Sequence, residues 1–528
     1  MLMRFVSATL IVLVSLWHYG CASRILGVFP TPSISHQIVF RALTLALRER
    51  GHELVVVTPD PVNDPMLTNY TEIDLHFLYP DSDDGENWIM TLAKERWTDI
   101  QDAYLSMVLS QTELILDHPE LRKLYAPNNG EKFDLMMIEM LYYPALLPLA
   151  TRFDVPVVGI TSLGLSLSIH YAIGNPIIHS HSSNWDTEER IFGEATLWQR
   201  LKSFVWVWKF LYKYRTRYMP AQQAMARKYF GNDIPDISDI ERNVSLVFVN
   251  QQTPISYVRP NIPKVIDIGG FHIAREIKPL PKDLEKILDD SMQGFIYMSL
   301  GSNIKSIMLS DEARGEFVAA FSELPYTVIW KFEDDFLANK PENVIIMKWT
   351  PQQSILAHPN LKVFIYQGGL QSTEEAVSHG IPVIGLPVFT DQYVHANKMA
   401  SLGVGIKLNI HFVNRHDILK AIRTVVLDTS DKKRMMNLRN LLEDKPYDSL
   451  ENAIWWTEHV IRHKGAPHLH STTADEPWYQ RQDMDIIFII SAGSLVTLSF
   501  VLVVFYKLLI CSIRAFNKLR ARQKDKLN

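Results

Sequence analysis

A glycine-containing turn in the second half of the chain has the composition of a phosphate-binding site. The residues Tyr366-Gln367-Gly368-Gly369 end an apolar, strand-like run, and a helical stretch begins at about Ser372. Free backbone N–H groups and the positive end of the helix dipole bind phosphate at such a junction. Many strand-to-helix turns contain a diglycine, so the turn alone is weak evidence. The longer run around it, from Trp349 to Gln392, is more specific.

Cysteine content and charge limit the remaining chemistry. The only cysteines are Cys21 and Cys511, so the chain between them has no disulfide, thiol nucleophile or thiolate metal site. The acidic run Asp81-Ser82-Asp83-Asp84 invites a metal interpretation, but it lies in a polar loop, and we interpret it as a solvated acidic segment. A net charge of -5 gives no reason to expect nucleic acid as a partner.

Two series of strand and helix patterns must position these residues. In the first, short apolar runs alternate with a helical stretch, which predicts a parallel sheet. A second series begins near Gly294, after a proline-rich stretch at about 253–281. We predict an α/β fold with two doubly wound, Rossmann-like domains that face a cleft at the carboxyl edges of their sheets. The predicted strands are 24–29, 52–57, 133–138, 155–160, 295–300, 326–331, 344–348, 361–365 and 382–385, and the predicted helices include 36–50, 310–323, 372–379 and 392–401.

Each end of the chain carries an apolar segment. Arg4, an apolar run and small residues up to Ser23 are typical of a secretory signal peptide, which we expect to be cleaved after about Ala22. Near the other end, 486–506 has no charge and is long enough to cross a bilayer. Lysine and arginine are abundant in 507–528, which predicts a cytosolic tail and a luminal body.

The tail and two sequons suggest a compartment. Lys524 and Lys526 end the chain in a pattern that resembles the lysine-based signal for return to the endoplasmic reticulum; the alternative is a basic flank of the membrane span. Glycosylation sequons at Asn69 and Asn243 agree with a luminal body. We therefore predict a single-pass type I protein of the endoplasmic reticulum membrane.

The segment 198–219 fits neither sheet. It mixes tryptophan, phenylalanine and tyrosine with lysine and arginine. Two interpretations fit this pattern: an amphipathic helix on the membrane surface, or a helix that covers a ligand pocket.

The run from Trp349 to Gln392 resembles the donor-binding signature of the UDP-glycosyltransferases, the family that includes the animal glucuronosyl- and glucosyltransferases of detoxification. The likeness extends over nearly the whole chain, including Phe133-Asp134, the turn 299–302 and both terminal segments. The start 24–36 and the form of 367–372 are most similar to insect members, especially those of moths and butterflies. The resemblance implies a GT-B fold, with the acceptor in the first domain and the UDP-sugar in the second.

The resemblance also implies roles for the donor residues. Trp349 would stack on uracil beside Gln352, Glu375 would accept both ribose hydroxyls, and Asp391 and Gln392 would bind the sugar. The diphosphate would lie against the glycine turn and a serine of the 299–302 turn. No cofactor or metal is expected, because backbone amides and the helix dipole stabilise the leaving diphosphate. The donor residues expected on this basis are Ser302, Trp349, Gln352, Gln367, Gly368, Gly369, Gln371, Ser372, Glu375, Asp391 and Gln392.

Catalysis needs a base for the acceptor hydroxyl, and the family uses a histidine held by a carboxylate. His36 and Glu139 occupy the matching positions, although most relatives have aspartate where Glu139 stands. A neutral histidine takes a proton near pH 7, and a carboxylate partner fixes its tautomer and stabilises the cation. A single displacement would then invert the anomeric centre.

Two departures from the family pattern keep other functions open. Gln367 replaces a histidine found in many relatives, and Tyr366 replaces a small residue that precedes it and could crowd the turn. One alternative is a weakly active member that binds or carries acceptors. Another is a lipid glycosyltransferase, for which 198–219 would be an entry ramp.

The predicted function is transfer of a hexose, glucose in most insect relatives and glucuronate in many vertebrate ones, to a small lipophilic hydroxyl compound such as a phenol or flavonoid. Variable loops at about 61–117 and 161–188 would form the acceptor pocket. Both a monomer and homo- or hetero-oligomers fit the sequence. The predicted segments are a signal peptide (1–22), an acceptor-binding domain (23–255), a linker (256–281), a UDP-sugar-binding domain (282–455), a return segment and stalk (456–485), a transmembrane helix (486–506) and a basic tail (507–528).

Overall fold

The computed structural model describes residues 22–79, 97–188, 190–274 and 276–524. The chain divides after His470 into a large body and a C-terminal unit, which are described separately. The expected signal peptide up to residue 21, the acidic run at 81–84 and the terminal Lys526 lie outside the described residues.

The first half of the body is built on a seven-stranded parallel sheet in the order β3-β2-β1-β4-β5-β6-β7. Successive strand residues alternate between two apolar layers: Ile25 of β1 packs in one layer, while Leu26 and Val28 pack in the other. The strands are β1 (Arg24–Val28), β2 (Glu53–Thr58), β3 (Tyr70–Asp74), β4 (Leu135–Glu139), β5 (Val157–Thr161), β6 (Leu246–Val249) and β7 (Val265–Asp267). The helices of this half are α2 (Ile34–Glu49), α4 (Trp97–Asp117), α5 (Pro119–Tyr125), α6 (Pro148–Phe153), α7 (Leu167–Ala172), α8 (Leu197–Lys213), α9 (Met219–Phe230) and α10 (Ile237–Arg242).

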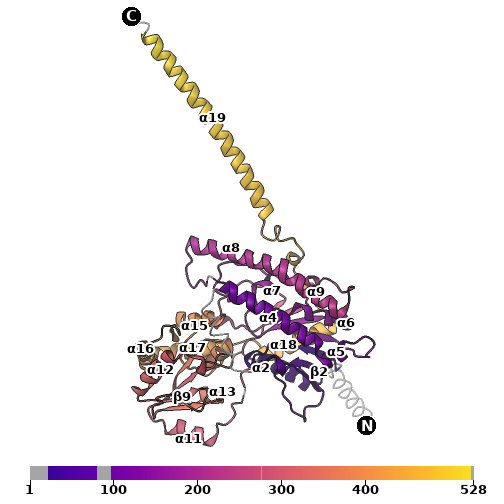
Figure 1. Cartoon of the computed structure of the whole chain (residues 1–528), viewed down its shortest axis with the longest axis vertical. Coiled ribbons are helices and arrows are strands. Elements are labelled where there is room, and N and C mark those ends of the chain that lie inside the picture. The colour runs from indigo at the N-terminus through magenta and orange to yellow at the C-terminus, as the bar shows by residue number, and fades with distance from the viewer. Residues whose placement is uncertain (1–21, 80–96, 189, 275, 525–528) are drawn as a thin grey trace, which may run out of the picture. The chain divides into compact units, whose positions relative to one another are not determined.

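The second half has a six-stranded parallel sheet in the order β10-β9-β8-β11-β12-β13. Its apolar core also forms two layers, one on each face of the sheet. Figure 1 shows the two sheets with their helices in separate halves of the body. The strands are β8 (Phe295–Ser299), β9 (Thr327–Lys331), β10 (Val344–Met347), β11 (Leu361–Tyr366), β12 (Val383–Gly385) and β13 (Gly405–Lys407), and the helices are α11 (Lys282–Asp290), α12 (Asp311–Ser322), α13 (Gln352–Leu356), α14 (Leu370–Ser378), α15 (Gln392–Ser401), α16 (Arg415–Leu427) and α17 (Thr429–Glu443).

The chain then returns to the first half. Helix α18 (Ser449–His463) packs against α2, and its Ala453 and Ile454 join the apolar layer that contains Ile25. The chain is therefore back on the first half at α18. This packing ties the end of the body to the first sheet.

The predicted strands and helices are present, and the described part of the chain contains four further strands that were not predicted. β3 and β13 lie at sheet edges, and β7 has three residues. β7 lies inside the stretch expected to be a linker and pairs with β6, so the first sheet extends into that stretch. β3 is largely polar and β7 and β13 have three residues each, so they give little periodic pattern, whereas β6 is a short, wholly apolar run.

The C-terminal unit contains α19 (Met484–Lys524), which includes the predicted span 486–506 and continues through most of the basic tail. Its mean hydropathy reaches 2.5, and its length and composition suffice to cross a membrane. In the body, both sequon asparagines are exposed, but the Asn243 side chain donates a hydrogen bond to the Asp239 carbonyl.

Candidate active site

A cavity of about 1100 Å³ lies between the two halves of the body. Its walls come largely from the carboxyl ends of parallel strands: β1 and β4 in the first half, and β8, β11 and β12 in the second. In doubly wound folds, loops at these ends are not needed to pair strands and are free to bind ligands.

A buried histidine–glutamate pair lies at the first-half wall of the cavity. The Nδ1 atom of His36 lies 2.9 Å from Oε1 of Glu139, and both side chains are buried. β1 and β4 are neighbours in register, which brings the loop after β1 beside the last residue of β4. His36 lies in the first turn of α2, because the helix begins at Ile34, two residues before the predicted start.

The second oxygen of Glu139 is also held. The backbone N–H of Thr31 donates to Oε2 over 3.1 Å. An ionised carboxylate only accepts hydrogen bonds, so with Glu139 ionised a neutral His36 would carry its hydrogen on Nδ1.

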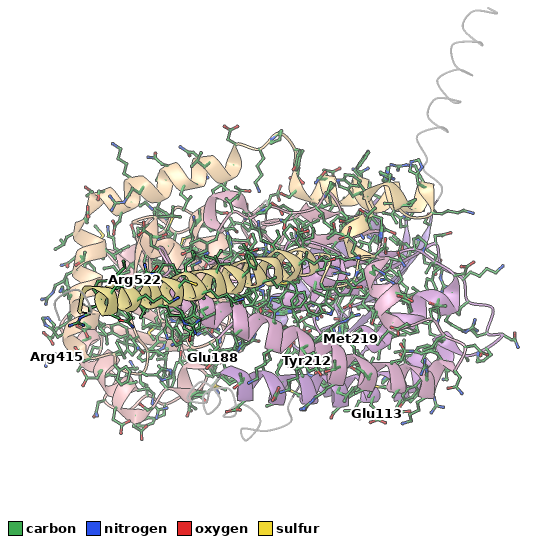
Figure 2. All side chains as sticks on the ribbon, turned by 90° about the horizontal axis from the view of Figure 1, so that it is seen from above. Glu113, Glu188, Tyr212, Met219, Arg415 and Arg522 are labelled. Carbon is green, nitrogen blue, oxygen red and sulfur yellow. The ribbon has the colours of Figure 1, made fainter. Side chains whose placement is uncertain are left out.

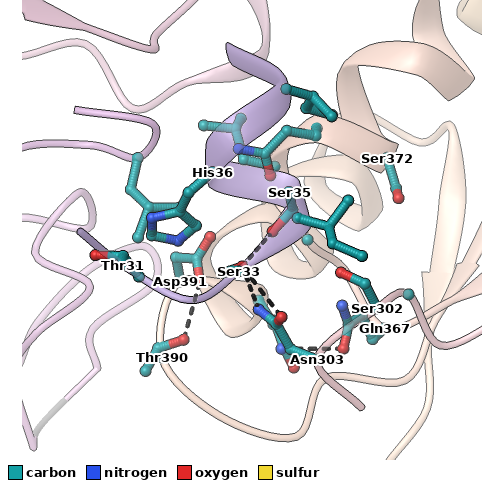
Figure 3. Close-up of a pocket in the computed structure, with 18 of the residues that line it drawn as sticks. Thr31, Ser33, Ser35, His36, Ser302, Asn303, Gln367, Ser372, Thr390 and Asp391 are labelled. Atoms are coloured by element: carbon teal, nitrogen blue, oxygen red, sulfur yellow. Dashed lines mark hydrogen bonds between the residues drawn. The ribbon is translucent and has the colours of Figure 1, made fainter. Parts of the chain in front are cut away.

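The loop before α2 touches the second half. Ser33 Oγ lies 3.0 Å from Nδ2 of Asn303 and 3.1 Å from its Oδ1. Figure 3 shows His36 on its helix and Ser302, Asn303 and Gln367 around the same hollow. Asn303 was not predicted, although it directly follows a predicted donor residue.

The glycine turns of the second half have the backbone shapes that only glycine adopts easily. Gly301 and Gly368 both have φ of +91°, in the left-handed region. A Cβ on Gly368 would lie 2.7 Å from the carbonyl oxygen of Gln392. Gly368 does not line the cavity itself, and its role is to bring β11 close to the start of α15.

The turn between β11 and α14 and the residues around the start of α15 form one hydrogen-bonded group. Gln392 donates to Gln367 Oε1 over 3.2 Å and accepts from the backbone N–H groups of Val388 and Phe389. Thr390 has φ of +51°, which is costly for a β-branched residue, and its hydroxyl donates to Asp391. This strained turn holds Asp391 at the cavity wall.

Two glutamines hold a buried carboxylate in the second-half wall of the cavity. Gln352 donates to Glu375 Oε2 over 2.6 Å, and Gln353 donates to Oε1 over 3.0 Å. Burial raises the pKa of Glu375 to about 7, against the lowering effect of these hydrogen bonds. Trp349 is 61% exposed, with the ammonium of Lys331 5.6 Å from its ring centre. Trp349 and Glu375 line the same cavity.

The neighbouring Glu374 points the other way and joins the two halves. It accepts hydrogen bonds from Gln252 over 2.7 Å and from Asn250 over 3.3 Å. Burial raises its pKa to about 7 and lowers the pKa of His272, whose ring lies between Glu374 and Glu375, to about 4. These cross-half contacts were not predicted.

Of the two side chains that depart from the family pattern, Tyr366 lies away from the cavity and Gln367 faces it. Tyr366 is fully buried in the core below the sheet, where its hydroxyl lies 3.0 Å from Thr373 Oγ1, and it does not crowd the turn. Gln371 donates to the carbonyl of Ser162 in the first half, so it also bridges the halves. Gln367 faces the cavity.

The first-half wall of the cavity is mostly aromatic and aliphatic. Part of it comes from α4, which lies in a stretch expected to be a loop. Asp186 is a buried carboxyl in this wall; burial raises its pKa to about 6, and the backbone N–H of Leu167 donates to it. The apolar wall comprises Leu78, Trp97, Ile100, Tyr104, Met107, Leu141, Tyr142, Tyr143, Leu163 and Trp185.

Comparison with known sequences gives a consistent group of relatives. The family model described as "UDP-glucoronosyl and UDP-glucosyl transferase" matches residues 25–523. UDP-glucosyltransferase 2 of Dactylopius coccus is 35% identical, over 88% of this chain and 89% of its own length. The ecdysteroid UDP-glucosyltransferase of Spodoptera littoralis nuclear polyhedrosis virus is 31% identical, over 89% of this chain and 94% of its own length.

Solved structures with the same fold include a UDP-glucosyltransferase from Polygonum tinctorium, described as capable of glucosylating indoxyl, in complex with 3,4-dichloroaniline. The structural match covers 84% of this chain and 100% of the plant chain, with a TM-score of 0.55 and 16% sequence identity. The likeness to solved glycosyltransferases confirms the predicted fold class, two Rossmann-type sheets in the GT-B arrangement.

Proposed function

Because the chain belongs to the UDP-glucuronosyl and UDP-glucosyl transferase family, and is thus a glycosyltransferase that uses a UDP-sugar, we propose a specific reaction for it. The enzyme moves glucose from UDP-glucose to a hydroxyl of a small lipophilic compound such as a phenol or flavonoid, with inversion. Glucose is supported by the names of the relatives, several of which are UDP-glucosyltransferases.

The observation that carries the proposal is the His36–Glu139 pair at the cavity wall. Glu139 accepts a 2.9 Å hydrogen bond from Nδ1–H of His36, and this leaves Nε2 as the base. As the acceptor oxygen bonds to the anomeric carbon, Nε2 takes the hydroxyl proton. The bond between that carbon and the diphosphate oxygen breaks, and its electron pair leaves with UDP. The carboxylate stabilises the resulting imidazolium.

The donor side would hold UDP-glucose along the second half of the cavity. Trp349 stacks on uracil, Gln352 lies beside the base and Glu375 accepts the ribose hydroxyls. The diphosphate lies at Ser302 and the turn 367–372, where the N-terminus of α14 favours the leaving anion. Asp391 and Gln392, held by the strained turn at Thr390, bind the sugar hydroxyls.

The first-half wall supports the proposed acceptor class. Aromatic and aliphatic side chains line it, and an apolar compound would replace water there at a gain of about 25 cal/mol per Å² of apolar surface. This supports an aromatic acceptor that presents one hydroxyl to His36.

The setting proposed for the enzyme is the endoplasmic reticulum membrane. α19 would cross the bilayer, with the body in the lumen, glycans on Asn69 and Asn243, and Lys524 and Lys526 read as a retrieval signal. No cofactor is proposed, and the UDP-sugar is a co-substrate.

The test is sugar transfer by microsomes that contain the wild-type chain or His36→Ala. UDP-glucose and UDP-glucuronate are each offered with a panel of phenols and flavonoids. We expect transfer from UDP-glucose that disappears in His36→Ala and persists in His416→Ala, a matched change at an exposed histidine of α16.

Other results would replace the proposal. Equal sugar transfer by His36→Ala and the wild type would show that His36 is not the base. A wild type that binds UDP-glucose but transfers to no acceptor would favour a carrier, and transfer to lipid extracts alone would favour a lipid glycosyltransferase.

A further inference from the structure

Helix α8 has two apolar faces, and only one of them is buried. The buried face packs into the first-half core through Trp206, Val207 and Phe210. At 100° per residue, the exposed apolar side chains fall on one continuous arc of about 120° on the opposite side. We name this arc the outer stripe; it comprises Leu197, Trp198, Leu201, Phe204, Val205 and Tyr212.

The outer stripe is exposed to an unusual degree. Trp198 is 64%, Val205 56% and Tyr212 71% exposed. Beyond α8 the helix passes through a π-helical turn (Tyr214–Tyr218) into α9, and Figure 2 labels Tyr212 and Met219 along this path. Apolar patches of this kind on a soluble surface mark an interaction site.

The outer stripe does not serve the ligand cavity. Among the described residues that line the cavity, none lies between 197 and 219. The segment therefore does not form the described cavity wall, and its exposed face is free for another occupant.

Cations border the outer stripe on both sides. Lys202 and Lys209 lie along one border and Arg200 along the other, all exposed. Aromatic and aliphatic side chains flanked by lysine and arginine suit the boundary between phosphate headgroups and acyl chains. A symmetric pairing of two copies through this face would instead bring like charges together.

The same chain carries an apolar helix of membrane-spanning length. α19 is joined to the body by the segment 471–483, which spans at most about 45 Å when fully extended. If α19 crosses a bilayer, as proposed above, the body stays within this distance of the lipid surface. Tethering of this kind favours contact between α8 and the lipid, because the second binding event is then intramolecular.

We propose that the outer stripe of α8 lies on the phospholipid surface, with Leu201 and Val205 at the acyl boundary and Lys202 and Lys209 among the phosphate groups. The body is then held to the membrane at a second place besides α19.

The test uses the full chain, without Cys21 and Cys511, reconstituted in phosphatidylcholine vesicles with a minor share of phosphatidylserine. A nitroxide is attached at Val205→Cys, and its collisions with oxygen and with a water-soluble nickel complex are measured. Leu427→Cys, on the exposed end of α16, is the aqueous control, and Val501→Cys reports whether α19 is in the bilayer.

We expect the oxygen-to-nickel collision ratio at Val205→Cys to be several-fold above that at Leu427→Cys. Adding Leu201→Glu should lower it toward the control value while sugar transfer persists, which shows that the body is folded. Equal ratios at the two positions, with Val501→Cys in lipid, would overturn the proposal and leave the anchor intact. An aqueous Val501→Cys would overturn the anchor itself. The nitroxide at Val205→Cys could instead be shielded from both oxygen and nickel and show spin–spin broadening that vanishes on dilution with unlabelled chain. That result would mean that a second copy of the chain covers the outer stripe.

Discussion

The two sides of the cleft differ in how their residues are brought together. Most donor-side residues come from one run, 349–392, and hydrogen bonds between glutamines, a carboxylate and backbone groups fix their positions. The acceptor wall comes from separate segments around α4, the end of β4 and the 163–186 stretch, and it consists mainly of apolar contacts.

This difference indicates how specificity is divided. A polar, hydrogen-bonded site rejects a ligand that lacks its partner groups, because buried polar atoms are then left unpaired. An apolar wall discriminates by shape, at only about 1–3 kcal/mol per methylene. We therefore expect strict donor use and a broad acceptor range. The following predictions test this division.

The largest effect is expected where the two sides meet, at Glu139. Glu139→Gln can donate a hydrogen bond to His36 Nδ1 and so favour the wrong tautomer. The loss of an equivalent carboxylate costs about 10⁴-fold in a hydrolase triad, and we expect kcat to fall about 10³- to 10⁴-fold here. KM for both substrates should change little. Steady-state rates with varied donor and acceptor measure this.

Two further variants control for that change. Glu241→Gln removes another buried glutamate of the first half, outside the cavity, and should leave kcat near the wild-type value. Glu139→Asp keeps the charge and should retain part of the activity. A kcat for Glu139→Gln within about tenfold of the wild type would show that the carboxylate does not set the tautomer.

A smaller, donor-specific effect is expected at Glu375. A hydrogen bond to a charged group contributes about 1.5–3 kcal/mol, so Glu375→Gln should raise KM for UDP-glucose about 10- to 150-fold, whatever the acceptor. The pKa of Glu375 is raised to about 7, and the ionised form accepts the ribose hydroxyls better. In the wild type, KM for UDP-glucose should therefore fall as the pH rises through about 7.

Glu375→Gln should abolish this dependence, and Glu312→Gln on exposed α12 should preserve it. Measurements of KM for UDP-glucose between pH 6 and pH 8.5, roughly a unit or more on each side of the raised pKa, distinguish the two variants. A flat wild-type profile would mean that Glu375 is already ionised when the donor binds.

The same division explains what the sequence alone could predict. The strands that end at the cavity are buried, apolar runs, and 349–392 lies in one piece, so its residues could be placed by their family pattern. His36 and Glu139 are 103 positions apart, and only their family positions paired them before the fold was known.

Contacts between distant segments could not be predicted. Glu374 and Glu375 are adjacent, and one helical step of about 100° decides which faces the donor and which faces Asn250. No local pattern reveals that choice. Likewise, the apolar spacing of α4 does not say whether its side chains fill a core or line a cavity.

The smallest effect is expected on the acceptor wall, at Ile100. This side chain is half-buried on α4 and lines the cavity. Ile100→Ala removes apolar contact worth about 1 kcal/mol, so KM for a bulky aromatic acceptor should rise roughly fivefold. KM for UDP-glucose should stay unchanged, because no donor contact is lost. Ile240→Ala on α10, half-buried outside the cavity, controls for general loosening of the first half. If Ile100→Ala raised KM for donor and acceptor together, the two sides would act as one site, and the division of specificity between them would fail.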